Sequence, residues 1–198
     1  MGRVSQAQAH ENRQRVVATA SRMFREKGTA VSVADLMKAV GLTHGGFYKQ
    51  FASKEDLVDE AIARAFGVAA AYSAEAYDEH AGEPEAARRA LIEHYLSVWH
   101  RDHAGGGCPV SGFAADLGRE PGQAARAHHA YLNGVRNLAA RLATDDDDGL
   151  AQLCTMVGAL VLARATRGDA LSEELLQAAR AALTEGGTRR SEPQQRTD

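Results

Sequence analysis

The helix start and stop signals in one short stretch near the N-terminus constrain the fold most. Gly28 and Gly41 are placed to end helices, and Ser32, Thr43 and Ser53 are placed to begin them. Because these stop and start signals follow one another closely, the stretch predicts two short helices between two long ones. Apolar residues recur at helical spacing along the chain, and no strand-like alternation lasts. The sequence therefore predicts an all-α protein.

The apolar spacing and the capping signals predict about nine helices, over residues 7–27, 32–40, 43–51, 53–80, 84–101, 109–117, 121–143, 149–167 and 171–185. Three of them begin at prolines, namely Pro84, Pro109 and Pro121. We expect an N-terminal three-helix helix-turn-helix domain over residues 1–55 and a C-terminal helical bundle over residues 56–185. The polar tail, residues 186–198, is expected to be disordered.

Composition excludes several classes of protein. With 44% hydrophobic and 25% charged residues, the chain resembles ordinary globular proteins. No apolar run is long enough for a transmembrane helix, and the N-terminus lacks the apolar core of a secretory signal, so we expect a cytoplasmic protein without a membrane partner. Its two cysteines do not suggest a disulfide framework.

Charge is divided unevenly along the chain. Residues 1–54 contain nine Lys+Arg and three Asp+Glu, whereas residues 55–198 contain fourteen Lys+Arg and twenty-three Asp+Glu. A basic end on an acidic body suggests that this end faces a polyanion. The alternative is a chance fluctuation in composition.

The third predicted helix carries two adjacent glycines, Gly45 and Gly46. Each glycine costs roughly 1 kcal/mol relative to alanine in a helix, and the segment is only about two turns long. Phe47 and Phe51, four residues apart, are expected to point at the same core. Since propensity does not explain the glycines, we interpret them as a place where another macromolecule approaches the backbone closely.

The residues around these glycines suit DNA recognition. Thr43 and His44 stand at the N-terminus of the second helix of a helix-turn-helix pattern, where side chains meet base edges. Tyr48, Lys49 and Lys54 offer a hydroxyl and two ammonium groups, which are usual partners of phosphates. The alternative assigns Tyr48 to the edge of a small bundle and Lys54 to solvent.

The segment from Gly41 to Leu57, GLTHGGFYKQFASKEDL, resembles the signature of the TetR/AcrR (tetracycline-repressor) family of bacterial transcriptional regulators. The resemblance is strong over about residues 10–60, and elsewhere it lies only in the number and order of helices. It implies a homodimer that binds a palindromic operator in double-stranded DNA. It also implies a C-terminal domain that binds a small-molecule effector and thereby releases the repressor from DNA.

The resemblance assigns the base-facing positions of the recognition helix to Thr43, His44, Gly45 and Gly46. Tyr48 and Lys54 match the phosphate-binding tyrosine and lysine of the family, and Ser32 matches the phosphate-contacting cap of the preceding helix. Because two recognition positions are glycines, His44 and Lys49 become the main candidates for base readout.

The last two predicted helices form an apolar antiparallel hairpin. We expect residues 149–167 and 171–185 to pair with their copies as the four-helix interface of a homodimer. Two-fold symmetry would then match half-sites one or more helical turns apart, roughly 34 Å between centres. The alternative is ordinary packing of the hairpin within one chain.

The resemblance places an effector pocket inside the C-terminal bundle. The candidates to line it are Tyr95, Trp99, Cys108, Phe113 and Tyr131. Aromatic residues at helical spacing more often belong to a plain core. A metal site from His100, His103 and Cys108 matches no strong zinc pattern, so we predict neither a metal nor a cofactor.

Cys108 invites a second interpretation. It follows three glycines and precedes Pro109 at a helix N-terminus, a position that lowers the pKa of a thiol and suits a sensor of oxidants or electrophiles. The alternative is a small buried hydrophobic side chain, which is also what we predict for Cys154. A hydrolase built on Cys108 or Ser111 lacks a nucleophile-elbow motif, and we do not expect an enzyme.

Overall fold

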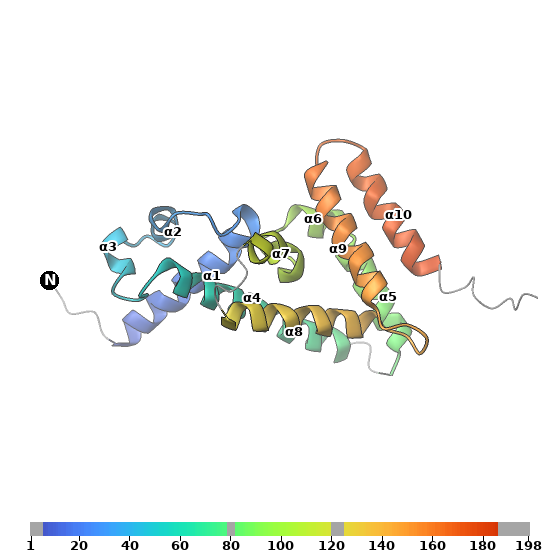
Figure 1. The fold of residues 1–198 in the computed structure, drawn as a ribbon, viewed down its shortest axis with the longest axis horizontal. Coiled ribbons are helices and arrows are strands. Elements are labelled where there is room, and N and C mark those ends of the chain that lie inside the picture. The colour runs from blue at the N-terminus through green and yellow to red at the C-terminus, as the bar shows by residue number, and fades with distance from the viewer. Residues whose placement is uncertain (1–5, 79–81, 120–124, 186–198) are drawn as a thin grey trace, which may run out of the picture. The chain divides into compact units, whose positions relative to one another are not determined.

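The computed structural model describes residues 6–78, 82–119 and 125–185, and Figure 1 shows their arrangement. Within these ranges the chain is helical, and the only β feature is an isolated bridge between Thr144 and Asp147. The all-α prediction is confirmed. The helices are α1 (Gln6–Lys27), α2 (Val33–Ala39), α3 (His44–Phe47), α4 (Lys54–Asp78), α5 (Pro84–Tyr95), α6 (Val98–Asp102), α7 (Pro109–Arg119), α8 (Ala125–Leu142), α9 (Leu150–Ala165) and α10 (Leu171–Glu185).

The described residues hold ten helices, whereas the sequence predicted about nine. The predicted helix over residues 84–101 is divided into α5 and α6. The division falls at Leu96 and Ser97, and the Ser97 hydroxyl accepts a hydrogen bond of 3.1 Å from the backbone N–H of His100. Ser97 therefore starts a new helix in the way an N-cap does, and this signal was missed in the sequence.

The third helix is shorter than predicted. Helix α3 covers only His44–Phe47, and the residues that follow it form a turn rather than a second helical turn. Adjacent glycines weaken a helix, which agrees with this early end. Prolines 84 and 109 begin α5 and α7 as predicted, whereas the predictions for Pro121 and for the tail at 186–198 lie outside the described residues.

The chain divides into two compact units. One unit contains Met1–Ala76 and His103–Asn137, and the other contains Tyr77–Asp102 and Leu138–Asp198. The predicted domain boundary between residues 55 and 56 lies inside the first unit and stays a prediction. In the described parts of both units, no helix is long and apolar enough to cross a bilayer.

The first unit is built on α1, which contacts α2 and α7. The side chains of Phe24, Phe47 and Phe113 are fully buried in its core. Phe47 and Phe51 stack with 5.3 Å between ring centroids, as their spacing predicted. Because burial of an aromatic side chain contributes about 3 kcal/mol or more, these contacts can hold short helices that are unstable alone.

The second unit is built on the α9–α10 hairpin, with α5 and α6 packed against it. Arg101 of α6 is buried and donates to the Ser172 hydroxyl at 2.9 Å, and it also forms an ion pair with Asp102. The Ser172 hydroxyl in turn donates to the carbonyl of Ala163 at 2.7 Å. This buried charge therefore links α6 to both helices of the hairpin.

Two arginines of the hairpin satisfy the C-terminal carbonyls of α6. Arg164 donates to the carbonyls of His100 and Arg101, at 3.0 and 3.2 Å, and Arg167 donates to the carbonyl of Arg101 at 2.8 Å. The last carbonyls of a helix have no partner inside it, and cations near them also favour the helix dipole. The five-residue α6 is thus held by side chains from α9 and from the turn after it.

His100 of α6 is buried, at 3% exposure. Its Nδ1–H donates to the carbonyl of Tyr95 at 2.7 Å. Burial, assisted by the positive charge of Arg164, lowers the pKa of His100 from 6.5 to about 4. The folded protein therefore contains this imidazole in its neutral form over a range of pH in which the unfolded chain protonates it.

This difference predicts that acid destabilises the protein through His100. The folded pKa lies below the unfolded one, so stability is complete above pH 6.5 and falls as the pH approaches 4. The loss is on the order of 3 kcal/mol at full effect. Chemical denaturation at several pH values should show it in the wild type and show a shallower dependence in His100→Gln, whose amide can still donate to Tyr95. The exposed His128→Gln serves as control, and an unchanged pH dependence in His100→Gln would contradict the assignment.

Candidate nucleic-acid interface

The turn between α2 and α3 depends on Gly41. This residue has φ +72°, a left-handed conformation that glycine adopts without strain. Its N–H donates to the carbonyl of Lys38 at 3.1 Å, and the N–H of Leu42 donates to the carbonyl of Met37 at 2.9 Å. These bonds end α2 abruptly and direct the chain into α3, as in a helix-turn-helix.

Serine caps begin the helices on either side of this turn. The Ser32 hydroxyl accepts a hydrogen bond from the Asp35 N–H at 3.1 Å and donates to the Asp35 carboxylate at 2.7 Å. The Ser53 hydroxyl accepts from the Asp56 N–H at 3.1 Å, and Lys54 is the first residue of α4. Ser32 is exposed, so its predicted phosphate contact is compatible with its capping role.

The α3 segment has one buried and one exposed side. Phe47 is fully buried, whereas the predicted DNA-contacting residues around it are exposed or half-buried. Tyr48 is 63% exposed, and its ring packs edge-on against the rings of His44 and Phe47. The exposed side comprises Thr43, His44, Gly45, Tyr48 and Lys49. Thr43 precedes the helix as predicted, but its side chain makes no capping hydrogen bond.

The fold itself does not require the two glycines of α3. A methyl group added at Gly45 would meet nothing within 4 Å, and one at Gly46 would touch Met37 and Thr43 at an ordinary 3.6 Å. Neither residue is among the glycines with positive φ. Gly134 of α8 is different, because a methyl group there would lie 2.1 Å from the ring of Phe66. Packing among the described residues therefore does not require glycine at position 45.

Arg13 of α1 connects the elements around α3. Its guanidinium forms a two-bond ion pair with Glu60 of α4 and donates through Nε to the carbonyl of Gln50 at 3.3 Å. It also lies 4.6 Å from the centroid of the Phe51 ring. The hydrogen bonds to Glu60 raise the pKa of Arg13. Sequence reasoning missed this role, because Glu60 is 47 residues away and no local pattern joins them.

A second arginine of α1 performs a similar task. Arg15 donates to the carbonyl of Val40, the C-cap of α2, at 3.0 Å. The two arginines thus connect the end of α2 and the segment after α3 to α1.

The sequence of this region resembles that of a known family. Residues 16–61 match the sequence model described as bacterial regulatory proteins, tetR family. The helix-turn-helix region of the chain is therefore of the tetR-family type. The match covers α2 and α3 and parts of α1 and α4, and thus includes every element that shapes the helix-turn-helix.

Proteins similar to this chain are found by sequence and by structure. The HTH-type transcriptional regulator AcrR of Shigella flexneri is 36% identical over 61 residues, which are 30% of this chain and 28% of AcrR. The match thus spans less than a third of that relative. A TetR-family regulator from Agrobacterium tumefaciens is similar in fold, with a TM-score of 0.73, 20% identity, and coverage of 90% of this chain and 98% of that one. The reduced form of E. coli NemR gives a TM-score of 0.72, 19% identity, and coverage of 89% and 96%.

The five predicted effector residues are divided between the two compact units. Phe113 is fully buried in the core of the first unit, and the half-buried Tyr131 donates to the carbonyl of Val110 at 3.3 Å. In the second unit Tyr95 is buried and Trp99 is 53% exposed. Phe113 therefore serves the core, and the ligand-binding role of these residues stays a prediction.

Cys108, the fifth candidate, is half-buried immediately before α7. Its carbonyl accepts hydrogen bonds from the Gly112 N–H and the Ser111 hydroxyl, both at 3.1 Å. The neighbouring Arg25 donates to the carbonyl of Gly107 at 2.7 Å. Burial lowers the pKa of Arg25. The redox-sensor interpretation of Cys108 stays a prediction.

The second cysteine corrects the sequence analysis. Cys154 is exposed, although we predicted that it lies in the core. It stands on an α9 helix that is apolar on both sides, and it belongs to the outer one. Within the described residues, no three His, Cys, Asp or Glu side chains are grouped so that they could hold a metal ion.

Proposed function

We propose that this chain is a DNA-binding transcriptional regulator, a repressor that binds a palindromic operator as a homodimer and leaves it when a small-molecule effector binds. The observation that carries the proposal is the exposed side of α3, where Gly45 leaves backbone uncovered for no reason of packing. The tetR-family type of the helix-turn-helix region supports it. Such a regulator acts in the cytoplasm, where the bacterial DNA is.

In this proposal α3 enters the major groove. His44 and Lys49 are exposed beside the glycines and offer donors to base edges. The bare turn at Gly45 lets the helix axis approach the DNA more closely than a side chain would allow. Ser32, Tyr48 and Lys54 would contact phosphates and fix the register of the helix.

The proposal predicts opposite effects of Gly45→Ala on stability and on DNA binding. Alanine favours a helix by up to about 1 kcal/mol over glycine, and space is available for its methyl group, so the melting temperature should stay or rise. Affinity for a duplex selected from a random pool by the wild-type protein should fall roughly tenfold or more, which is about 1.4 kcal/mol. Fluorescence anisotropy and thermal melting measure the two effects.

The matched control is Gly67→Ala. Gly67 lies exposed in α4, and an added methyl group there also meets nothing within 4 Å. It should show the same change in stability without loss of DNA affinity. If Gly45→Ala binds DNA as well as Gly67→Ala does, the idea of close approach at α3 is wrong.

The homodimer would form through α9 and α10. Helix α9 buries Leu153, Met156 and Leu160 against its own chain, yet it exposes further apolar side chains. Those with the largest exposed fractions are Leu150 at 50% and Leu162 at 53%. Residues three, four, seven or eight apart share one helix face, so Cys154 shares a face with Leu150, with Val161 and with Leu162, and these residues form an apolar outer face. Such a face is typical of a helix that a second copy covers.

Leu162→Glu should therefore dissociate the dimer and leave the monomer folded. The side chain is half in solvent in the single chain, so the cost to monomer stability should stay below about 1 kcal/mol. A carboxylate in an apolar interface should weaken association roughly a hundredfold or more. Sedimentation equilibrium measures the mass. The control is Leu132→Glu on α8, where the leucine is 38% exposed. If Leu162→Glu dimerises as tightly as this control does, the proposed interface is wrong.

For the effector we propose an action through α4. A ligand shifts the equilibrium only if it binds the DNA-incompetent shape more tightly. Helix α4 begins at Lys54 beside the recognition segment and runs without a break to Asp78, past the end of the first compact unit at Ala76. A displacement of this one helix would thus reach the phosphate-binding Lys54 directly.

A further inference from the structure

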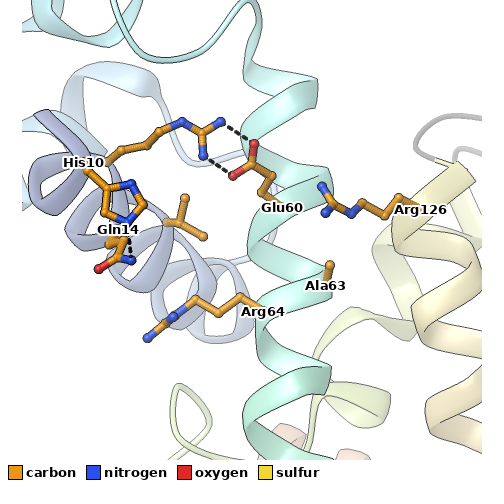
Figure 2. A pocket seen from close by; sticks show the side chains of 8 residues that line it. His10, Gln14, Glu60, Ala63, Arg64 and Arg126 are labelled. Atoms are coloured by element: carbon orange, nitrogen blue, oxygen red, sulfur yellow. Dashed lines mark hydrogen bonds and ion pairs between the residues drawn. The ribbon is translucent and has the colours of Figure 1, made fainter. Parts of the chain in front are cut away.

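The first unit contains a cavity of about 420 Å³ between α1, α4 and the start of α8 (Figure 2). Its lining includes three arginines, one from each helix, and a single glutamate. The arginines are Arg13, Arg64 and Arg126, and the glutamate is Glu60. We propose that this cavity is a binding site for a small multivalent anion, with carboxylate or phosphate groups.

The charges of the lining are not balanced within the chain. Glu60 is already engaged by Arg13 in a two-bond ion pair. Among the described residues, neither Arg64 nor Arg126 has a hydrogen-bond or ion-pair partner. The nearby carboxylate of Asp59 accepts the backbone N–H of Ala127 at 2.5 Å, so it is also occupied. Two guanidinium groups are therefore left for a ligand.

Arg64 and Arg126 come from different helices, and both line this cavity. In Figure 2 the side chain of Arg126 extends from α8 towards α4, and that of Arg64 extends from α4 on the side of α1. Further along α8, Gly134 lets this helix approach the ring of Phe66 on α4 closely. Close packing of this kind preorganises a site and reduces the entropic cost of binding.

The lining also indicates the kind of anion. Guanidinium groups bind carboxylates and phosphates through paired hydrogen bonds, and two of them suit a ligand with more than one negative charge. His10 and Gln14, bonded to each other at 2.8 Å, add polar groups at the edge. Val17 and Ala63 add apolar surface. A cavity of this volume is large enough for a small organic di- or tricarboxylate or a phosphate compound.

Occupancy of the site would act on the recognition segment through Arg13. An anion in the cavity competes with Glu60 for the Arg13 guanidinium, which also bonds to the carbonyl of Gln50 and covers the ring of Phe51. Both residues lie between α3 and α4. This consequence, unlike the binding itself, rests on the proposed function in DNA recognition.

Isothermal titration calorimetry with pyrophosphate and with citrate, at constant ionic strength and without DNA, tests the site. We expect at least one probe to bind once per chain with a Kd of about 1 mM or lower. Arg64→Gln and Arg126→Gln, which keep the length of the side chain approximately, should each weaken binding roughly tenfold. Arg136→Gln, an exposed arginine of α8 outside the cavity, is the matched control and should bind like the wild type.

Three results would overturn the proposal. The first is the absence of binding by either probe up to about 10 mM. The second is equal binding in all three variants. The third is a loss of affinity for the selected duplex in Arg64→Gln and Arg126→Gln with no loss of pyrophosphate or citrate binding, which would assign these arginines to the DNA footprint. Melting curves confirm that each variant is folded. Because the titration contains no DNA, its failure is distinct from a failure of the proposed function.

Discussion

The contacts of Arg13 with Glu60, Gln50 and Phe51 tie the segment between α3 and α4 to α1. Helix α3 is a single turn that contains two glycines, and a helix of that length has no stability of its own. Its direction is set by the left-handed turn at Gly41 before it and by the connection to α4 after it. Arg13 connects that segment to α1 through a half-buried charged contact.

The use of glycine separates the demands of folding from those of function. Gly149 has φ +78°, and a methyl group there would lie 2.1 Å from the carbonyl oxygen of Ala139, so packing alone explains it. Gly134 is explained in the same way by Phe66. Gly45 has an ordinary conformation and open space around it, and it lowers helix stability without a gain in packing. A cost that the fold does not explain is expected where another molecule binds.

The features of the fold that act over a few residues could be predicted from the sequence. The contacts between distant residues could not. The Gly41 stop, the Ser32 and Ser53 caps and the prolines of α5 and α7 act over a few residues, and the structure confirms them. The Arg13–Glu60 pair joins residues 47 apart and leaves no local trace in the sequence. Cys154 was wrongly assigned to the core because periodicity identifies an apolar face without showing whether the same chain or a second copy covers it. The cavity between α1, α4 and α8 likewise depends on contacts across three helices.

The most direct test of a dimer that reads DNA through α3 is selection of duplexes from a random pool by the purified wild-type protein, followed by sequencing. The account predicts an enriched inverted repeat whose two half-sites lie one helical turn apart, about 34 Å between centres, or a multiple of that distance. An absence of enrichment, or enrichment of a single half-site with no symmetric partner, would contradict it.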